Sequence, residues 1–490
     1  MVDSRIMVWT SIAGIAGALW LVALVYWRSW RFRKLERLPP GSMGWPLIGE
    51  LIPYVTIARS EAPYIFPMER EKKYGTVFKT SLLTGKTIMI TDVEGVKFVL
   101  HNEGVLFESG YPRSLKDVLG EHAMLFQHGE LHKRMHAMLK RFVSSTPLKK
   151  HLTREMELLT KQGMSTWSRG TKILLQDEIQ RITHDFLMKQ LFGLEPGKLS
   201  ATIFEEFNRL MGGIIGIPLM IPGTPYHRAM KARKKLTKII SGMVAFRRSR
   251  PDIEHKDILN ALIEEIKQEE RDADQIIVDN ALINIANAEG IPAVIIAFAV
   301  KNLSENPKAL EQIREENLAI RKGKDPSEGL TWNEYMSLDF THAVFNETLR
   351  LANGAQGVMR KALKDVEFRG YVIPKGWTVL PYFLNIHFDE KMFPQPTKFH
   401  PWRWLEVLST TSHSCNFATW LQQRSIPSSY VLPFGGGARL CPGQELAKVQ
   451  TAVFLHHFVT QFRWEAEPEK VINFPKISTK NHLPVVLHDL

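Results

Sequence analysis

Cysteines and blocks of charge are both scarce in this chain, and each scarcity excludes a class of protein. Two of the 490 residues are cysteines, Cys415 and Cys441, and neither lies in a C-x-x-C pair, so a disulfide-rich secreted scaffold and a paired-cysteine zinc site are excluded. Repeats and low-complexity tracts are absent, and a 44% apolar content is too high for a disordered chain. The net charge of +12 is spread along the sequence, which favours an anionic docking surface but predicts no nucleic-acid partner.

A long uncharged run near the N-terminus predicts a membrane anchor. Residues Ile6–Trp27 carry no charge, and this run exceeds the roughly 18 to 20 residues that span a bilayer as a helix. A cleaved secretory signal is the alternative, but its apolar region is shorter, about 7 to 15 residues. The basic residues that follow mark the cytosolic side, namely Arg28, Arg31, Arg33, Lys34 and Arg37. We therefore expect a transmembrane anchor over 6–27, a basic, proline-rich hinge over 28–46 and one cytosolic domain over 47–490.

The pattern along this domain predicts a mainly helical fold with small β-sheets. Residues 74–101 alternate apolar and polar side chains around a turn at Thr84 and Gly85, so we expect a small sheet there. Residues 128–350 show helical periodicity, interrupted by prolines and glycines. Short strands are expected again at Val366–Pro374 and Trp377–Tyr382.

One predicted helix is apolar on every side and yet carries an acid. The segment Ile276–Val300 is nearly all apolar, so this helix, about 35 Å long at 1.5 Å per residue, should cross the core. Glu289 is the one ionisable residue after the first turn, and Pro292 removes the hydrogen bond that the carbonyl of Ala288 would accept. A functional acid beside an opened helix and a structural acid paired with a distant arginine fit this pattern equally well.

The strongest local signal is a glycine-rich loop that contains a cysteine. Residues Phe434–Gly443 read FGGGARLCPG and precede a helical segment. Glycines let the backbone approach a flat ligand, backbone N–H groups and a helix start can stabilise Cys441 as a thiolate, and Arg439 can bind an anionic group. A nucleotide-phosphate loop would need Gly-Lys-Ser/Thr after the glycines, and this loop lacks it. A plain glycine-rich turn before a core helix is the alternative.

Three motifs in a fixed order give the chain a family resemblance. The loop has the spacing F-x-x-G-x-R-x-C-x-G, Glu347 and Arg350 stand in an E-x-x-R pattern, and Arg403 stands in a P-x-R-x element. With these motifs the chain resembles the cytochrome P-450 family over essentially its whole length. The resemblance implies that the three charged residues form an ion-paired clamp, and two guanidinium groups on one carboxylate suit a buried site. A solvated surface pair is the alternative.

The resemblance also implies a haem b cofactor, which is iron protoporphyrin IX. Cys441 is then the axial ligand of the iron, and the arginines grip the propionates. The implied cofactor-binding residues are Cys441, Arg439, Arg360, His132, His136 and Phe434. The two histidines stand where relatives carry W-x-x-x-R, and their imidazoles can still donate hydrogen bonds, although less strongly. Zinc binding by this i,i+4 pair is the alternative, and it would need a third ligand.

The oxygen-activating helix of the family departs from its usual pattern here. Relatives carry A/G-G-x-D/E-T-T/S, whereas residues 286–290 read ANAEG. The resemblance implies that Glu289 is catalytic, but Gly290 stands where relatives have an alcohol that passes protons. Three outcomes are open: a water or a substrate hydroxyl replaces the alcohol, reducing power is wasted, or the reaction is atypical. We favour the first, because Glu289 and the carbonyl opened by Pro292 can hold a water chain.

Further motifs resemble the plant steroid and triterpenoid branch, above all its brassinosteroid-pathway hydroxylases. These motifs are Tyr111–Ser114, Leu131–His136, Ile221–Thr224, Arg360–Val366 and Pro374–Trp377. The branch implies oxidation of a large apolar steroid with O2 and with electrons from NADPH, delivered by a membrane-bound reductase. With the predicted anchor, this places the protein in the endoplasmic reticulum membrane. A triterpenoid oxidase, or a haem-thiolate protein without monooxygenase activity, is the alternative.

The resemblance also suggests where substrate and reductase bind. Substrate contacts are expected at Gln356, Val358 and Ala286, whose small or amide side chains leave room for a rigid ring system. Gln356 is expected to meet a substrate hydroxyl. The basic residues expected to dock acidic reductase loops are Lys133, Arg134, Lys140, Arg141 and Lys448. Simple solvation of these charges is the alternative.

Overall fold

The chain is described by a computed structural model over residues 37–46, 48–82, 85–214, 218–288, 290–325, 328–352, 354–405, 433–474 and 477–490. The predicted anchor over 6–27, most of the predicted hinge, Cys415 and Glu289 lie outside these residues. Within the described part, the segment Ala273–Ser304 has the length and apolar character of a membrane span. However, 71% of its most apolar window is buried inside the molecule, as in a core helix.

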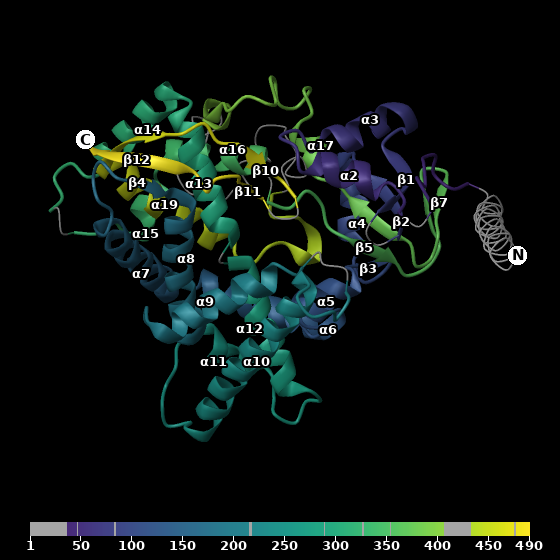
Figure 1. Cartoon of the computed structure of the whole chain (residues 1–490), viewed down its shortest axis with the longest axis horizontal. Helices are drawn as coiled ribbons and strands as arrows, with labels where there is room; N and C mark the ends of the chain where they lie inside the picture. The colour runs from purple at the N-terminus through teal and green to yellow at the C-terminus, as the bar shows by residue number, and fades with distance from the viewer. Residues whose placement is uncertain are drawn as a thin grey trace, which may run out of the picture.

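Helices form most of the molecule (Figure 1). In chain order the α-helices are α2 (Leu51–Ala58), α3 (Ile65–Tyr74), α4 (Val93–His101), α5 (Arg113–Leu119), α6 (Gly129–Ser144), α7 (Thr146–Ser165), α8 (Leu175–Phe192), α9 (Lys198–Met211), α10 (Pro225–Ser249), α11 (Ile258–Glu265), α12 (Ala273–Ala288), α13 (Gly290–Ser304), α14 (Pro307–Ala319), α15 (Trp332–Met336), α16 (Asp339–Ala352), α17 (Leu384–His387) and α19 (Gln444–Gln461). Short 3-10 helices are η1 (Met124–Phe126), η2 (Pro401–Trp404) and η5 (Gly437–Arg439). The prediction of a mainly helical fold is confirmed.

The described strands form four small sheets. In chain order they are β1 (Val77–Leu82), β2 (Gly85–Ile90), β3 (Phe107–Ser109), β4 (Lys172–Leu174), β5 (Arg360–Ala362), β6 (Val366–Phe368), β7 (Tyr371–Ile373), β8 (Thr378–Pro381), β9 (Phe462–Ala466), β10 (Val471–Ile472), β11 (Ser478–Thr479) and β12 (Pro484–Asp489). The largest sheet has the order β1-β2-β8-β5-β3, and the others are β4-β12-β9, β6-β7 and β10-β11. The expected strands near 366–374 and 377–382 are therefore present.

The prediction of a sheet over 74–101 is confirmed for its first part and wrong for its second. Strands β1 and β2 form the predicted hairpin, paired from Val77 opposite Ile90 to Leu82 opposite Gly85. Residues 93–101, in contrast, form helix α4. The Asp92 side chain accepts a hydrogen bond from the Gly95 N–H at 3.0 Å and so caps the helix start. Apolar residues of α4 recur at a helical spacing on its buried face, a period that the alternation reading missed.

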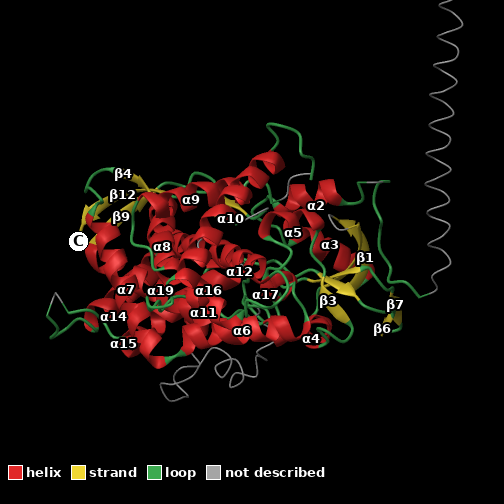
Figure 2. Ribbon diagram, turned by 90° about the horizontal axis from the view of Figure 1, so that it is seen from below, coloured by secondary structure: helices red, strands yellow, loops and turns green. Residues whose placement is uncertain are grey.

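The two larger sheets lie at opposite ends of the molecule. Figures 1 and 2 both show β1 and β3 at one end and β4 and β12 at the other, with α12, α16 and α19 between them. The β4-β12-β9 sheet joins the chain's last strand to a strand near residue 172. The sequence pattern did not predict this sheet, because β4 is three residues long and interrupts a helical region.

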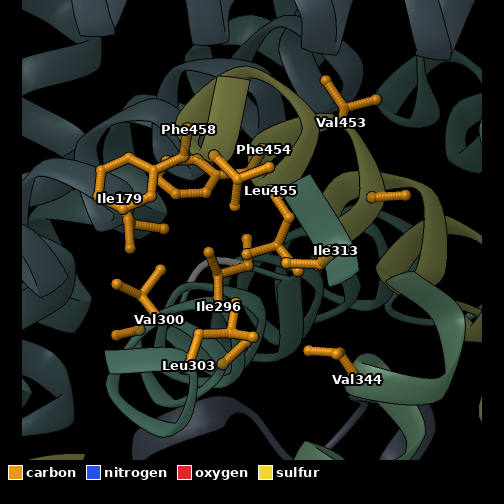
Figure 3. Close-up of a cluster of buried hydrophobic side chains, with 14 of the residues drawn as sticks. Ile179, Ile296, Val300, Leu303, Ile313, Val344, Val453, Phe454, Leu455 and Phe458 are labelled. Atoms are coloured by element: carbon orange, nitrogen blue, oxygen red, sulfur yellow. The ribbon is translucent and has the colours of Figure 1, made fainter. Parts of the chain in front are cut away.

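The core is built from helices that surround α13. Figure 3 shows its side chains meeting those of α8, α14, α16 and α19, and the labelled residues are Ile179, Ile296, Val300, Leu303, Ile313, Val344, Val453, Phe454, Leu455 and Phe458. All of them are buried. The predicted core helix corresponds to α12 before residue 289 and to α13 after it. Nearly all apolar residues of these two helices are buried. The prediction that this segment crosses the core is confirmed.

Candidate functional site

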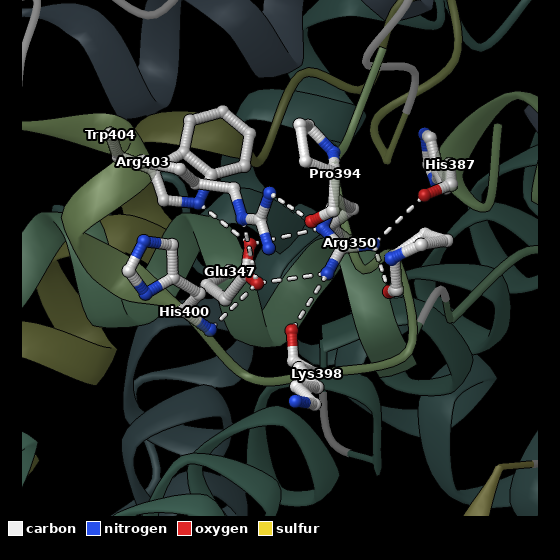
Figure 4. A network of polar contacts seen from close by, with 9 residues as sticks. Glu347, Arg350, His387, Pro394, Lys398, His400, Arg403 and Trp404 are labelled. Atoms are coloured by element: carbon white, nitrogen blue, oxygen red, sulfur yellow. Dashed lines mark hydrogen bonds and ion pairs between the residues drawn. The ribbon is translucent and has the colours of Figure 1, made fainter. Parts of the chain in front are cut away.

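The structure brings the three predicted clamp residues together (Figure 4). Glu347, on α16, is fully buried. Its two carboxylate oxygens accept hydrogen bonds from Nε and Nη2 of Arg350, at 3.0 and 2.8 Å. Arg403, in η2, donates its Nε–H to the same carboxylate at 3.1 Å. The surface-pair alternative is excluded for these residues, because the carboxylate is not exposed to water.

Two further donors complete the hydrogen bonding of this carboxylate, and the sequence analysis had identified neither of them. The Trp404 Nε1–H donates to Glu347 at 2.8 Å, and the backbone N–H of His400 donates at 2.9 Å. Glu347 thus accepts five hydrogen bonds, enough to offset the removal of its charge from water. The second tryptophan of the P-W-R-W element was the available signal, since a buried indole N–H requires an acceptor.

Arg350 binds backbone carbonyls on the side facing away from the acid. Its Nη1 donates to His387 O at 2.8 Å and to Pro396 O at 2.7 Å. The first carbonyl is that of the last residue of α17, and the second belongs to the irregular chain between α17 and η2, which has few helix or sheet partners of its own. Because buried carbonyls need donors, the clamp holds this chain on α16.

Cys441 lies in the turn between η5 and α19. Its backbone N–H donates to Phe434 O at 3.0 Å and closes the loop. Cys441 is exposed as a residue, although protein surrounds its thiol on most sides. Burial raises the pKa of the thiol, and the hydrogen bond from the Gly443 N–H opposes this rise without cancelling it. The loop alone therefore favours the neutral thiol, and a bound cation would be needed to favour the thiolate.

The rest of the cysteine loop packs on two elements. Gly437 has a positive φ of 65°, and a Cβ there would lie 2.4 Å from Leu100 O, so a side chain would push η5 away from α4. Phe434 is half-buried against a cluster from α13 and α16 that includes Phe345, with ring centroids 6.5 Å apart. The loop is thus held between the core helices and α4.

Arg360 and Arg439, the two predicted anion-binding arginines, share a carboxylate that the sequence reading missed. Glu103 Oε1 lies 2.6 Å from Nε of Arg439, and its Oε2 lies 2.6 Å from Nε of Arg360. All three side chains are at most 10% exposed. Arg439 also donates to the carbonyl of Gln127 at 2.6 Å. Glu103 lies far from both arginines in the sequence and in no motif, so no local signal identified it.

The predicted histidine pair lies beside this loop on α6. The rings of His132 and His136 stack with centroids 5.7 Å apart. His136 donates its Nε2–H to Leu440 O at 2.7 Å and so holds the residue that precedes Cys441. Burial and then the charge of Arg439 lower the pKa of His132 to about 4, so this imidazole is neutral at pH 7. Within the described residues, no group of three or more His, Cys, Asp or Glu side chains could hold a metal ion, so the zinc alternative lacks its third ligand there.

The core helix has an open face in its middle. Asn287 is exposed and Ile291 is 38% exposed, whereas Gly290 and Pro292 are buried. Residues four apart share a helix face, so Asn287 and Ile291 form one strip. A Cβ on Gly354 would lie 3.3 Å from Cγ2 of Ile291, which places this strip opposite the chain that follows the E-x-x-R motif.

The other predicted substrate residues differ in burial and in hydrogen bonding. Ala286 is half-buried on α12, and Val358 is half-buried against an apolar cluster of α4 and α17. Gln356 accepts a hydrogen bond from Tyr382 Oη at 2.9 Å and donates one to Asn473 O at 3.3 Å. Two polar atoms of this amide are thus already bound within the protein, and a substrate hydroxyl would have to share them.

Fewer of the basic residues predicted to dock a reductase are available at the surface than the sequence suggested. Arg134 and Arg141 form ion pairs with Glu265 at the end of α11, at 3.1 and 3.2 Å. Burial lowers the pKa of Lys448. The expected cations that stay exposed on α6 outside this ion-pair cluster are Lys133 and Lys140.

Similarity to known proteins identifies the family of this chain. The family description "Cytochrome P450" matches residues 39–487. This chain belongs to the cytochrome P450 family. The 3-epi-6-deoxocathasterone 23-monooxygenase of Arabidopsis thaliana is 38% identical to this P450 over 457 residues, 92% of this chain and 89% of the relative. The 3beta,22alpha-dihydroxysteroid 3-dehydrogenase of the same plant is 38% identical over 463 residues, 94% of each chain.

A third relative and a solved structure extend the match. Cytochrome P450 85A1 of Oryza sativa subsp. japonica is 36% identical over 491 residues, 99% of this P450 and 100% of the relative. The solved structure of retinoic acid bound cyanobacterial CYP120A1 superposes with a TM-score of 0.80 and covers 93% of this chain and 99% of its own, at 23% identity. That likeness shows the fold. The sequence relatives show a P450 monooxygenase related to plant brassinosteroid hydroxylases.

The residues around Cys441 fit the haem that the family implies. Cys441 is an exposed residue whose thiol is mostly surrounded by protein, and two guanidinium groups that are at most 10% exposed share one carboxylate. Among the described atoms, Nε of Arg360 and Oε2 of Glu103 are buried without a hydrogen bond of good geometry. Cys441 would hold the iron, and Arg360 and Arg439 would hold a propionate. When bound, haem supplies the oxygen chemistry that no side chain provides.

Proposed function

We propose that this P450 is a membrane-anchored monooxygenase that oxidises a plant steroid of the brassinosteroid type, using O2 and electrons that a reductase takes from NADPH. The observation that carries the proposal is 38% identity, over 92% of the chain, to a steroid 23-monooxygenase. A second relative at the same identity is named for dehydrogenation at steroid carbon 3. The proposal therefore specifies the substrate class, and experiment must determine which carbon is oxidised.

The side chains near the open face of the core helix suit a large apolar substrate with few polar groups. Ala286, Ile291 and Val358 present apolar surface, which selects a rigid ring system by shape. Asn287 and Gln356 are uncharged polar residues close in sequence to these positions, and each carries both a donor and an acceptor. A steroid with one or two hydroxyl groups matches this composition.

Proton delivery is assigned to Glu289, as the family resemblance implies, with help from water. Because Gly290 replaces the usual alcohol, the acid needs a bridging group with a hydroxyl. A water held between Glu289 and the helix carbonyls, or a hydroxyl of the substrate itself, fills this role.

The proposal places the enzyme in the endoplasmic reticulum membrane, and two surface features support contact with a membrane and with a reductase. Apolar side chains are exposed in two separate segments, with Trp45 at 77% and Ile52 at 62% in one and Met220 at 61% in the other. Exposed apolar side chains of this size are suited to a lipid surface. Lys133 and Lys140 on α6 provide the cations for acidic reductase loops.

A second candidate function follows from the missing alcohol. A haem-thiolate enzyme that rearranges its substrate without external electrons has no need of a coupled proton relay, and Gly290 is the observation that favours it. Such an enzyme would convert substrate in the absence of NADPH and reductase.

One incubation separates these functions. The full-length protein in vesicles is mixed with reductase, NADPH and a panel of brassinosteroid precursors, phytosterols and triterpenoids, and products are identified by mass. We expect an oxygenated brassinosteroid-type product that requires NADPH and is lost in Cys441→Ala. If an oxygenated triterpenoid were the sole product, the substrate would be a triterpenoid rather than a steroid. An isomeric product formed without NADPH would show that the enzyme rearranges its substrate instead of oxygenating it. A wild-type protein that binds no haem would overturn both functions.

A further inference from the structure

Glu103, the carboxylate between the two arginines, occupies a position that the backbone fixes firmly. It lies in the turn between α4 and β3, where the N–H of Gly104 donates to Phe107 O at 2.7 Å. The N–H groups of Leu106 and Phe107 donate to Asn102 O at 3.0 and 3.2 Å. This short turn leaves Glu103 little freedom to move.

Glu103 joins three segments that are distant in the sequence. Arg360 begins β5, which pairs with β3 through Ser109 opposite Arg360. Arg439 lies in η5, where the cysteine loop touches α4 at Gly437. One side chain thus sets the relative position of two guanidinium groups, one from the sheet and one from the cysteine loop.

The charges of this cluster do not cancel. Two arginines and one glutamate give +2 − 1 = +1. His128 and His132 add no charge at pH 7, because burial lowers the pKa of each. Glu108 and Lys116, which also act on His128, are of opposite sign. An uncompensated buried cation is costly, so the cluster is suited to one further carboxylate.

The geometry of the cluster leaves bonding capacity for that carboxylate. Nε of Arg360 lies 2.6 Å from Oε2 of Glu103, but neither atom makes a hydrogen bond of good geometry within the described part of the chain. A guanidinium group has five N–H donors in a fixed fork. Part of the Nη edge is already used: Arg439 donates to Leu125 O at 3.3 Å and to Gln127 O at 2.6 Å, and Nη1 of Arg360 donates to Met359 O at 3.2 Å. The N–H donors that these contacts do not use, above all those of Arg360, can bind a second anion.

We propose that Glu103 is a positioning residue for the haem of this enzyme: it aligns Arg360 and Arg439 in advance and leaves them one net positive charge with which to bind one propionate. This inference rests on the proposed function, because it assumes a haem protein. Its physical basis is preorganisation, since two long side chains that are already ordered lose less entropy when the cofactor binds.

The test is the rate at which Glu103→Gln holoenzyme loses haem to an excess of apomyoglobin. We expect transfer about tenfold faster than in the wild type, because both guanidinium groups gain alternative rotamers. The midpoint potential of the iron should also become more positive, because a nearby negative charge is removed. Transfer at the wild-type rate or slower would overturn the proposal, and slower transfer would mean that Glu103 competes with the propionate.

The matched control is Glu108→Gln, which removes a negative charge five residues away. Glu108 is 31% exposed and contacts His128 at 3.9 Å, so haem transfer should change less than about twofold. Should Glu103→Gln not fold, Glu103→Asp keeps the charge but is too short to span both arginines. It should release haem faster at an unchanged potential, and wild-type release would contradict the proposal. A wild-type protein without haem would instead refute the proposed function.

Discussion

Two buried carboxylates in this P450 each lie between two arginines, and they are satisfied to different degrees. Glu347 accepts five hydrogen bonds, and its partner Arg350 is also bound by backbone carbonyls. Glu103 has ion-pair contacts with Arg360 and Arg439, and its Oε2 accepts no hydrogen bond of good geometry within the described residues. The first carboxylate is fully hydrogen-bonded within the protein, whereas the second leaves one oxygen without a hydrogen bond beside Arg360, and its cluster has capacity for another anion.

This difference separates a structural cluster from a ligand-binding one. A buried ion pair contributes to stability only when all of its polar atoms have partners. The Glu347 carboxylate meets that condition, because both of its oxygens accept hydrogen bonds, and its cluster fixes a long irregular segment on α16. The Glu103 cluster does not meet it, which is the property expected of residues that bind a charged cofactor.

The largest expected effect is on stability, from Glu347→Gln. The change removes the charge that two buried arginines require, and breaking a buried pair in this way costs about 3–5 kcal/mol. The free energy of unfolding, measured by urea denaturation of the holoenzyme, should fall by that amount.

Two controls make this comparison quantitative. Glu130→Gln removes an acid that is 77% exposed and lies 4.0 Å from Lys133, so the cost should stay below about 0.5 kcal/mol. Trp404→Phe removes one hydrogen bond to the buried carboxylate and should cost about 1.5–3 kcal/mol. If Glu347→Gln were as stable as Glu130→Gln, the Glu347 cluster would not be the structural one.

Acid should destabilise the Glu347 region through His387. Burial, and then the charge of Arg350, lower the pKa of this imidazole to about 3, whereas an unfolded histidine titrates near about 6.5. The unfolded state therefore binds a proton that the folded state does not as pH falls below about 6.5. Stability present above that pH should be lost progressively towards pH 3. In His387→Gln the unfolding free energy should fall less steeply over this range, and parallel curves for the two proteins would contradict the assignment.

The sequence predicted those parts of the site whose signal is local. Cys441, Arg439 and the E-x-x-R pair lie within short motifs, and the core helix shows in its apolar composition. Glu103 and Trp404 were missed because each acts through a partner distant in the sequence, a relation that no local pattern contains. Helix α4 was misread as strand because its apolar residues were judged by alternation.

A smaller effect is expected where the cysteine loop meets α6. His136→Phe keeps a ring of similar size but removes the donor to Leu440 O, a hydrogen bond worth about 0.5–1.5 kcal/mol. The carbon monoxide complex of the reduced protein should therefore lose its thiolate-type absorption about 2- to 10-fold faster on mild heating. His136→Gln, which keeps an N–H donor, is the control and should stay close to the wild type. Equal rates in all three proteins would show that His136 does not support the loop.

The smallest expected effect concerns Gly290, which is buried in the core helix next to the exposed Ile291 and lies in neither charged cluster. Gly290→Thr restores the alcohol that relatives carry, so a proton can pass without a bridging water, and coupling should rise about twofold. Coupling is measured as product formed per NADPH consumed. Gly290→Val matches the shape of threonine without its hydroxyl and should give no gain. A gain in both variants would assign the effect to packing, and a gain in neither would contradict this account of the missing alcohol.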